Sequence, residues 1–245
     1  MNRFPQVILF DLDDTLLDNY RILKTLWPQV CAWGAEQIGV DSHVFFQTFD
    51  EIRIWFWNDG ERHRIWRQDL TAARTQIMKV TLEHMGKPDD VLAAALAHKY
   101  ATDFDQELHL FDDAIDTLQR IRRMDIRMGL ITNGAAATQR HKIEKFQLAP
   151  YFEHIFIEGE RGVGKPDPSA YCNALDAFDV KPHQMWIVGD NFEWEVAAPQ
   201  RLGIAGIWVD HAGVGVPLNS PVQPFRIVRS VGEIIPKDVG VEVTV

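Results

Sequence analysis

Three carboxylates lie within four residues near the start of the chain, at Asp11, Asp13 and Asp14, directly after the apolar run 7–10. Carboxylates this close repel one another and lose hydration when buried, so they need a cation, a proton or a bound substrate to compensate them. The apolar run that precedes them is typical of a buried strand. A buried strand that ends in concentrated negative charge predicts a metal-dependent active site.

Three later segments also place reactive residue types at strand or loop ends. They are Thr132-Asn133-Gly134, Gly164-Lys165-Pro166-Asp167-Pro168, and Gly189-Asp190-Asn191 followed by Glu195. Taken singly, such segments have structural explanations as a helix cap, a plain turn or a surface loop. Because the carboxyl ends of parallel strands share one edge of a sheet, we expect these segments to converge on the carboxylates of the first strand.

The elements that must position these residues alternate along the second half of the chain. Short apolar runs over 126–132, 154–157, 185–190 and 204–210 predict buried strands. Helical spacing of apolar residues predicts helices over 111–124 and 168–178. Strands that alternate with helices favour an α/β fold, a parallel sheet with helices on both faces.

The first half differs, because no convincing strand occurs between Leu17 and Glu107. At least four helical segments occupy it instead, with breaks at 58–60 and 86–88. We therefore predict a core domain of residues 1–17 and 107–245 and an all-helical cap domain, of four to five helices, over 18–106. A cap inserted there is expected to cover the crevice at the strand ends. The tail, with Pro221, Pro224 and Pro236, is expected to add an edge segment and a short helix.

The composition indicates an ordinary soluble globular protein. The chain has 245 residues, of which 46% are hydrophobic, and a formal net charge of −10, which opposes binding to nucleic acid or to an anionic membrane surface. No signal peptide or membrane span is predicted. The two cysteines, Cys31 and Cys172, suggest no zinc site or disulfide, and we expect buried thiols in a reducing cytoplasm. A monomer or a homodimer is compatible with the sequence.

Taken together and in this order, the four motifs resemble the haloacid dehalogenase-like (HAD) hydrolase superfamily. Its pattern is an Asp-x-Asp-x-Thr strand end, a Ser or Thr strand end, a Lys and a closing acidic pair. The resemblance covers Val7 to about Asp210 and is closest to the phosphatase branch with a helical cap after the first motif. It implies a Rossmann-like core and an enzyme that hydrolyses phosphoric monoesters.

For the first motif, the resemblance implies two roles for two carboxylates. Asp11 is implied as the nucleophile that attacks phosphorus and forms an aspartyl-phosphate. Asp13 is implied as the general acid and base, which protonates the leaving oxygen and then activates the hydrolytic water. Asp14 has no role that we can assign.

A phosphate and two carboxylates cannot share a pocket without cations, and Mg²⁺ is favoured because it prefers oxygen ligands. By resemblance, its ligands are the Asp11 side chain, the Asp13 backbone carbonyl and the Asp190 side chain. Glu195 stands where a second Asp is more usual, so it is a further candidate ligand or a residue that orients Lys165. A structural alternative for Glu195 is a favourable interaction with a helix dipole.

The second and third motifs are implied to hold the substrate phosphate. Lys165 supplies positive charge, and the Thr132 hydroxyl and the backbone N–H groups at Asn133 and Gly134 can bind phosphate oxygens. The expected substrate is a small phosphate ester of the phosphoglycolate, nucleotide or sugar phosphate type.

Other functions remain open at this point. A halide leaves without a proton, so Asp13 favours phosphate-ester hydrolysis over dehalogenation. A sugar phosphomutase uses the same pair of carboxylates, and a non-catalytic binding protein could retain the fold. In the cap, the aromatic residues Phe45, Phe46, Phe49, Trp55, Phe56, Trp57 and Trp66 are expected to pack in its core. The basic segment 62–67 is expected to form a solvated face.

Overall fold

The computed structural model describes residues 4–235, and these form two compact units. The first unit combines the residues up to Asp18 with those from Leu110 onward, and the second is Asn19–His109. The insertion predicted over 18–106 thus begins one residue earlier and ends three residues earlier than the helical unit. Pro236 of the predicted tail lies outside the described residues.

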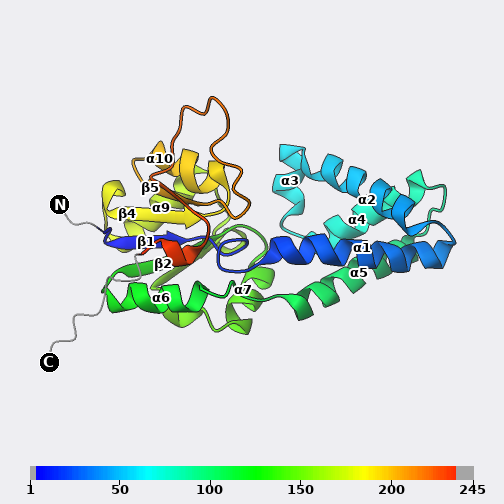
Figure 1. Ribbon diagram of the computed structural model, residues 1–245, viewed down its shortest axis with the longest axis horizontal. Coiled ribbons are helices and arrows are strands. Elements are labelled where there is room, and N and C mark those ends of the chain that lie inside the picture. Colours follow the sequence, from blue (N-terminus) through cyan, green and yellow to red (C-terminus); the bar gives the residue numbers. More distant parts are fainter. Residues whose placement is uncertain (1–3, 236–245) are drawn as a thin grey trace. The chain divides into compact units, whose positions relative to one another are not determined.

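A six-stranded parallel sheet forms the centre of the first unit, in the spatial order β3-β2-β1-β4-β5-β6. Its strands are β1 (Val7–Phe10), β2 (Arg127–Thr132), β3 (His154–Ile157), β4 (Met185–Gly189), β5 (Ala205–Val209) and β6 (Arg226–Val228). β1 lies between β2 and β4, with Phe10 opposite Leu130 on one side and Val188 on the other (Figure 1). The strand order reverses at β1, and such a switch point is where α/β sheets bind ligands.

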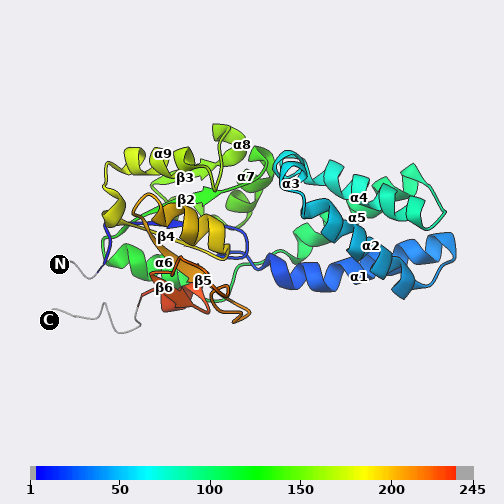
Figure 2. The ribbon, with the colours of Figure 1, turned by 90° about the horizontal axis from the view of Figure 1, so that it is seen from above.

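Helices cover both faces of this sheet, which confirms the predicted fold class. They are α6 (Ala114–Arg123), α7 (Ala136–Lys145), α8 (Glu158–Arg161), α9 (Pro168–Phe178) and α10 (Ala198–Gln200), with a π-helix over Phe192–Ala197 and 3₁₀ turns over Ala149–Tyr151, Pro182–Gln184 and Val231–Glu233. α9 and α6 lie on opposite faces (Figure 2). The helix predicted over 111–124 is shorter and begins at Ala114. The residues before it form a turn, in which the Ala114 N–H donates to the Phe111 carbonyl.

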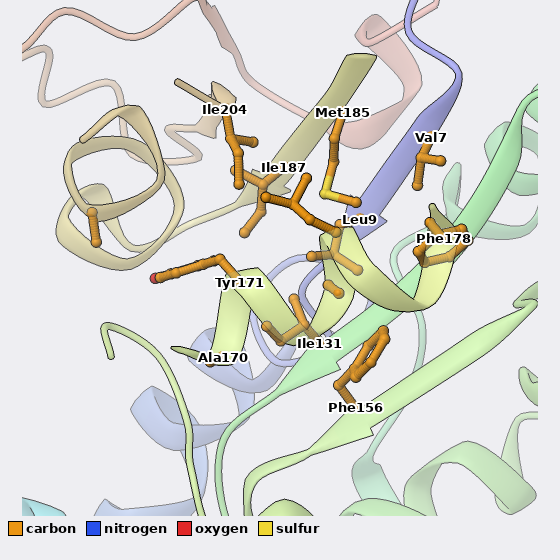
Figure 3. Packing of buried hydrophobic residues seen from close by; sticks show 13 residues of the cluster. Val7, Leu9, Ile131, Phe156, Ala170, Tyr171, Phe178, Met185, Ile187 and Ile204 are labelled. Atoms are coloured by element: carbon orange, nitrogen blue, oxygen red, sulfur yellow. The ribbon is translucent and has the colours of Figure 1, made fainter. Parts of the chain in front are cut away.

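An apolar core lies between α9 and the central strands, and α9 also contacts the segment that follows β4. Leu9 of β1 and Ile187 of β4 are fully buried and pack in one cluster with Phe178 and Tyr171 of α9 (Figure 3). The Tyr171 hydroxyl donates a hydrogen bond to the Trp194 carbonyl at 2.6 Å. This hydrogen bond ties α9 to the π-helix, so the apolar core also fixes the position of that π-helix.

The second unit is entirely helical, as predicted, with α1 (Asn19–Ile38), α2 (Ser42–Trp57), α3 (Gly60–Trp66), α4 (Leu70–His84) and α5 (Asp90–Glu107). α1 packs against α2 and α5, and α4 packs against the same two helices. Four of these helices begin after an aspartate whose carboxylate accepts an N–H of the first turn, at Asp41, Asp59, Asp69 and Asp89. Such N-caps define where each helix starts.

Aromatic side chains form much of the core of the helical unit. Phe45, Phe49 and Phe56 are buried, as predicted. Trp55 differs, because 54% of its surface is exposed, and the guanidinium of Arg62 lies 3.9 Å from the centroid of its ring. At least one residue of the basic segment therefore covers an exposed aromatic ring, a favourable cation–π contact.

The two cysteines are free and differ in exposure. Cys31 is buried, as predicted, but the prediction of a buried thiol is wrong for Cys172, which is exposed. On α9, Tyr171 faces the core, whereas Cys172 and Asn173 are exposed. Within residues 4–235, no helix has both the length and the apolar character needed to cross a bilayer.

The close approach of β5 to the π-helix gives a testable prediction. A Cβ at Gly206 would lie 2.3 Å from the Glu195 carbonyl oxygen and 2.8 Å from the Val196 Cα. Because backbone atoms stand in the way, Gly206→Ala should lower the free energy of unfolding by about 1–3 kcal/mol, measured by urea denaturation. Gly60→Ala is the control, since a Cβ there meets no atom within 4 Å. Equal stability of Gly206→Ala and the wild type would contradict this packing.

Candidate active site

Asp11 is the first residue after β1 and is buried at the switch point of the sheet. Its backbone N–H donates to the Val188 carbonyl at 2.9 Å, which extends the pairing with β4 by one residue. One carboxylate oxygen accepts from Lys165 Nζ at 2.5 Å, and the other accepts from the Thr15 hydroxyl at 3.2 Å. The side chain is therefore held in one orientation by two donors.

Lys165 is fully buried and bridges two carboxylates. Its Nζ donates to Asp11 at 2.5 Å and to Glu195 Oε1 at 2.7 Å. Its main chain is held by the Asn133 side chain, which donates to the Lys165 carbonyl at 2.7 Å and accepts from the Lys165 N–H at 2.9 Å. The loop that carries the lysine is thus fixed by the residue that follows Thr132 in the second motif.

Glu195 lies in the π-helix and is fully buried. Its second carboxylate oxygen accepts from the Asn191 N–H at 2.8 Å. A Cβ at position 189 would lie 2.2 Å from the Glu195 Cγ, so Gly189 leaves the space that this side chain fills. Both oxygens of Glu195 contact protein donors, and the structure brings this residue to Lys165.

Asp13 contacts α7, a helix from which sequence analysis singled out no residue. One Asp13 oxygen accepts from Lys142 Nζ at 2.7 Å, and the other accepts from Gln139 Nε2 at 2.8 Å. The same Gln139 nitrogen donates to the Thr132 hydroxyl oxygen at 2.5 Å. Asp13 and Thr132, which come from two neighbouring strand ends, are therefore joined through one amide group.

The second motif contacts a further residue that sequence analysis missed. The Gly134 N–H, expected to bind phosphate, donates to Glu158 Oε2 at 3.0 Å. Glu158 is buried at the start of α8. The Asn133 side chain is held by the Lys165 loop through two hydrogen bonds.

Asp190 follows β4, and its backbone carbonyl accepts from the Trp208 indole at 2.7 Å. Burial raises the pKa of Asp190 well above its ordinary value, and the charges of Asp11, Glu195 and Asp14 raise it further. Asp14 has a positive φ of 56°, and its carbonyl accepts from His211 at 2.8 Å. Asp14 thus shapes the turn after Asp13 and adds negative charge to the site.

The electrostatics of the cluster show a deficit of positive charge. Burial raises the pKa of Glu195 to about 7 and also raises the pKa of Asp11, although Lys165 opposes both shifts. Burial alone would lower the pKa of Lys165, but Asp11 and Glu195 outweigh it, so that this pKa lies above its ordinary value. Asp190 is half-buried and its charge also interacts with Lys165, so one ammonium group serves three carboxylates, and protons or a further cation must compensate the excess charge.

A metal at this site would need more than side-chain ligands. Within residues 4–235, no three His, Cys, Asp or Glu side chains are grouped closely enough to form a metal site by themselves. Asp11 and Asp190 could supply two carboxylates, and the Asp13 backbone carbonyl a third oxygen. This donor set suits Mg²⁺, which usually keeps several waters and takes one or two carboxylates.

Comparison with known proteins places this geometry in a family. Residues 5–203 match the model described as haloacid dehalogenase-like hydrolase. Phosphoserine phosphatase of Thermus thermophilus is 29% identical over 231 residues, which cover 84% of this chain and 88% of that protein. Glyceraldehyde 3-phosphate phosphatase of Pyrococcus furiosus is 29% identical over 83% of this chain and 80% of its own length. N-acylneuraminate-9-phosphatase of Rattus norvegicus is 35% identical over 53% of this chain and 52% of its own.

Solved structures share the fold across nearly the whole chain. A HAD-hydrolase of Bacillus subtilis, bound to magnesium, superposes with a TM-score of 0.71 at 21% identity and covers 94% of this chain and 97% of its own. A 2-haloacid dehalogenase of Pseudomonas syringae has a TM-score of 0.62 at 25% identity, over 92% and 94% of the two chains. The predicted superfamily and fold are confirmed.

The excess negative charge predicts an unusual effect of a substitution at Asp190. Because the folded-state pKa of Asp190 is raised, its contribution to stability is present below its ordinary pKa and is lost as the pH rises through the raised value. Asn mimics the protonated form at every pH. In metal-free buffer, Asp190→Asn should therefore be more stable than the wild type at pH 8, by at least about 1 kcal/mol or about 2–4 °C in Tm, with a smaller gain at pH 5.

Asp210→Asn is a control for this experiment, because the opposite effect on stability is expected. Burial would raise the pKa of Asp210, but the N–H groups of Gly213, Val214 and Gly215 outweigh it, and the pKa is lowered. Asp210→Asn should accordingly destabilise the protein at pH 8. A loss of stability in Asp190→Asn at pH 8, similar to that in Asp210→Asn, would contradict the charge deficit. Thermal unfolding in EDTA at both pH values measures the difference.

Proposed function

The chain belongs to the haloacid dehalogenase-like hydrolase family, and from this we propose that it is a Mg²⁺-dependent phosphatase acting on a small phosphorylated metabolite. The names of its curated relatives support this reaction class. One observation carries the proposal. Asp11 and Asp13 follow the central strand, and the buried Lys165 lies 2.5 Å from the Asp11 carboxylate. This arrangement can bring a nucleophile, an acid and a phosphate-neutralising cation to one phosphoryl group.

Asp11 is proposed as the nucleophile of the first step. One of its carboxylate oxygens attacks phosphorus, the bond between phosphorus and the ester oxygen breaks, and an aspartyl-phosphate forms. The contacts of Asp11 with Lys165 and Thr15 support this role, because they fix the carboxylate before the substrate arrives. Such preorganisation lowers the entropic cost of reaching the attack geometry.

Asp13 is proposed as the acid and base of both steps. It donates a proton to the leaving alkoxide in the first step, and in the second it accepts a proton from the water that attacks the phosphorylated Asp11 and releases inorganic phosphate. Its side chain is 29% exposed, compared with 9% for Asp11. This difference supports the assignment, because the acid and base must reach both the leaving oxygen and the attacking water.

Lys165 and the Thr132 hydroxyl are proposed to hold the phosphate oxygens, with the backbone N–H of Asn133. An ammonium group and a hydroxyl donor are both suited to anionic oxygens. A role for Gly134 would require its N–H to exchange Glu158 for the phosphate. Glu195 is proposed to orient Lys165, since both of its oxygens contact protein donors.

Mg²⁺ is proposed as the cofactor, held by the Asp11 side chain, the Asp13 backbone carbonyl and the Asp190 side chain. The raised pKa of Asp190 supports this, because it reflects a carboxylate partly removed from water beside the negative charges of Asp11 and Glu195. When bound, the metal would neutralise charge on the phosphoryl group and on the two carboxylates.

Substitution of the nucleophile tests the reaction. The wild type, given Mg²⁺ and a panel of glycolate, nucleotide, sugar and sialic acid phosphates, should release inorganic phosphate from at least one ester. Asp11→Asn should reduce kcat at least about 10³-fold, because the neutral amide cannot attack phosphorus. Asp176→Asn, an exposed position on α9, is the matched control and should keep full activity. A wild type no more active than Asp11→Asn would contradict the proposal, and an isomeric sugar phosphate as the product would indicate a phosphomutase.

Metal dependence is tested by stability as well as by activity. Mg²⁺ at about 100 times its dissociation constant should raise the unfolding free energy of the wild type by about 2.7 kcal/mol at pH 8. The effect should be smaller at pH 5, since protons compete for Asp11 and Asp190, whose pKa values are raised. Asp190→Asn should show little stabilisation by Mg²⁺ at either pH. Equal stabilisation of both proteins, measured by thermal shift, would remove Asp190 from the ligand set.

A further inference from the structure

We propose that Gln139 and Lys142 are positioning residues for the proposed phosphatase reaction, which orient the Thr132 hydroxyl toward phosphate and hold the Asp13 carboxylate. The inference rests on the proposed function and adds two residues to it. Gln139 and Lys142 are three residues apart on α7, so both side chains lie on one face of the helix. Their contacts with Asp13 span 126 and 129 residues of sequence.

Lys142 and Gln139 each contact one oxygen of the Asp13 carboxylate. Lys142 Nζ lies 2.7 Å from one oxygen of Asp13, and Gln139 Nε2 lies 2.8 Å from the other. An amide nitrogen donates hydrogen bonds and an amide oxygen only accepts them. The side-chain NH₂ of Gln139, and not its carbonyl, must therefore face Asp13.

The orientation of Gln139 in turn determines the role of the Thr132 hydroxyl. The second N–H of the same NH₂ group donates to the Thr132 oxygen at 2.5 Å. A hydroxyl has one proton to donate, and here a lone pair already accepts from Gln139. The Thr132 oxygen lies 3.5 Å from the Asn133 carbonyl, which is too long for a strong O–H···O hydrogen bond. The hydroxyl proton is thus left to donate to an anionic oxygen of the substrate.

Burial shows that these contacts matter energetically. Gln139 is 2% exposed and Lys142 is 7% exposed, and with Ile143 they form the buried face of α7. A buried lysine or amide is costly unless it is paired or hydrogen-bonded. Apolar side chains at 139 and 142 would satisfy helix packing without this cost. Polar side chains on this face are explained by their contacts with Asp13 and Thr132.

The two residues should affect different kinetic constants. Gln139→Met keeps a similar volume but removes both N–H donors, so the Thr132 hydroxyl is free to turn away from phosphate. KM and the inhibition constant for inorganic phosphate should each rise at least about tenfold. Lys142→Met removes the cation that holds Asp13, so kcat should fall at least about tenfold, while the phosphate inhibition constant changes less than about threefold. Lys142→Arg should restore most of kcat, because it retains the charge.

Lys145→Met is the matched control, because Lys145 is exposed on the same helix and its loss should change neither constant. The proposal is overturned if Gln139→Met keeps the phosphate inhibition constant within twofold of the wild type, or if Lys142→Met behaves like Lys145→Met. It is also overturned if Gln139→Met and Lys142→Met only lower the amount of folded protein, while KM, kcat and the phosphate inhibition constant of the folded protein stay unchanged.

Direct binding separates this inference from the proposed function. Isothermal titration of inorganic phosphate into the wild type and Gln139→Met, with Mg²⁺ present, requires no turnover. Weaker binding by at least about tenfold in Gln139→Met supports the positioning role even if no ester in the panel is hydrolysed. Equal binding in an otherwise active enzyme refutes the positioning role and leaves the phosphatase proposal intact.

Discussion

A buried lysine between two carboxylates is the interaction on which the rest of the site depends. Removing an ion from water costs several kcal/mol, and this cost is offset only where partners meet it with good geometry. Lys165 meets Asp11 and Glu195 at 2.5 and 2.7 Å. These three residues come from three distant parts of the chain, so β1, the loop before α9 and the π-helix must all be in place together.

Two glycines and one asparagine make the contacts of Lys165 with the two carboxylates possible. Gly189 and Gly206 stand where any side chain would collide with Glu195 or its backbone. Asn133 holds the main chain of Lys165 through two hydrogen bonds. The structural role of these residues is therefore to fix backbone positions, so that the buried charges need no adjustment when a substrate binds. A site held in this way has little freedom to relax, which is the condition for electrostatic preorganisation.

The sequence singled out the residues at strand ends and Glu195 of the π-helix, but it missed the two residues of α7 that reach the site. Asp11, Lys165 and Asp190 follow apolar runs or turn signals, and the parallel arrangement of the strands brings such ends together. Gln139 and Lys142 carry a weaker signal, because polar residues at helical spacing normally indicate a solvated face. That this face of α7 is buried against the end of β1 depends on the folding of the whole sheet, which no local pattern contains. The same holds for Gly134, whose partner Glu158 is 24 residues away.

The fold alone does not distinguish phosphate-ester hydrolysis from dehalogenation, since proteins of both kinds share it with this chain. The reactions differ at the leaving group, because an alkoxide needs a proton and a halide does not. Asp13 is the residue that can supply this proton, and two buried polar side chains of α7 hold it. On the proposed mechanism, the choice of reaction therefore depends less on the Lys165 cluster than on the residues that contact Asp13.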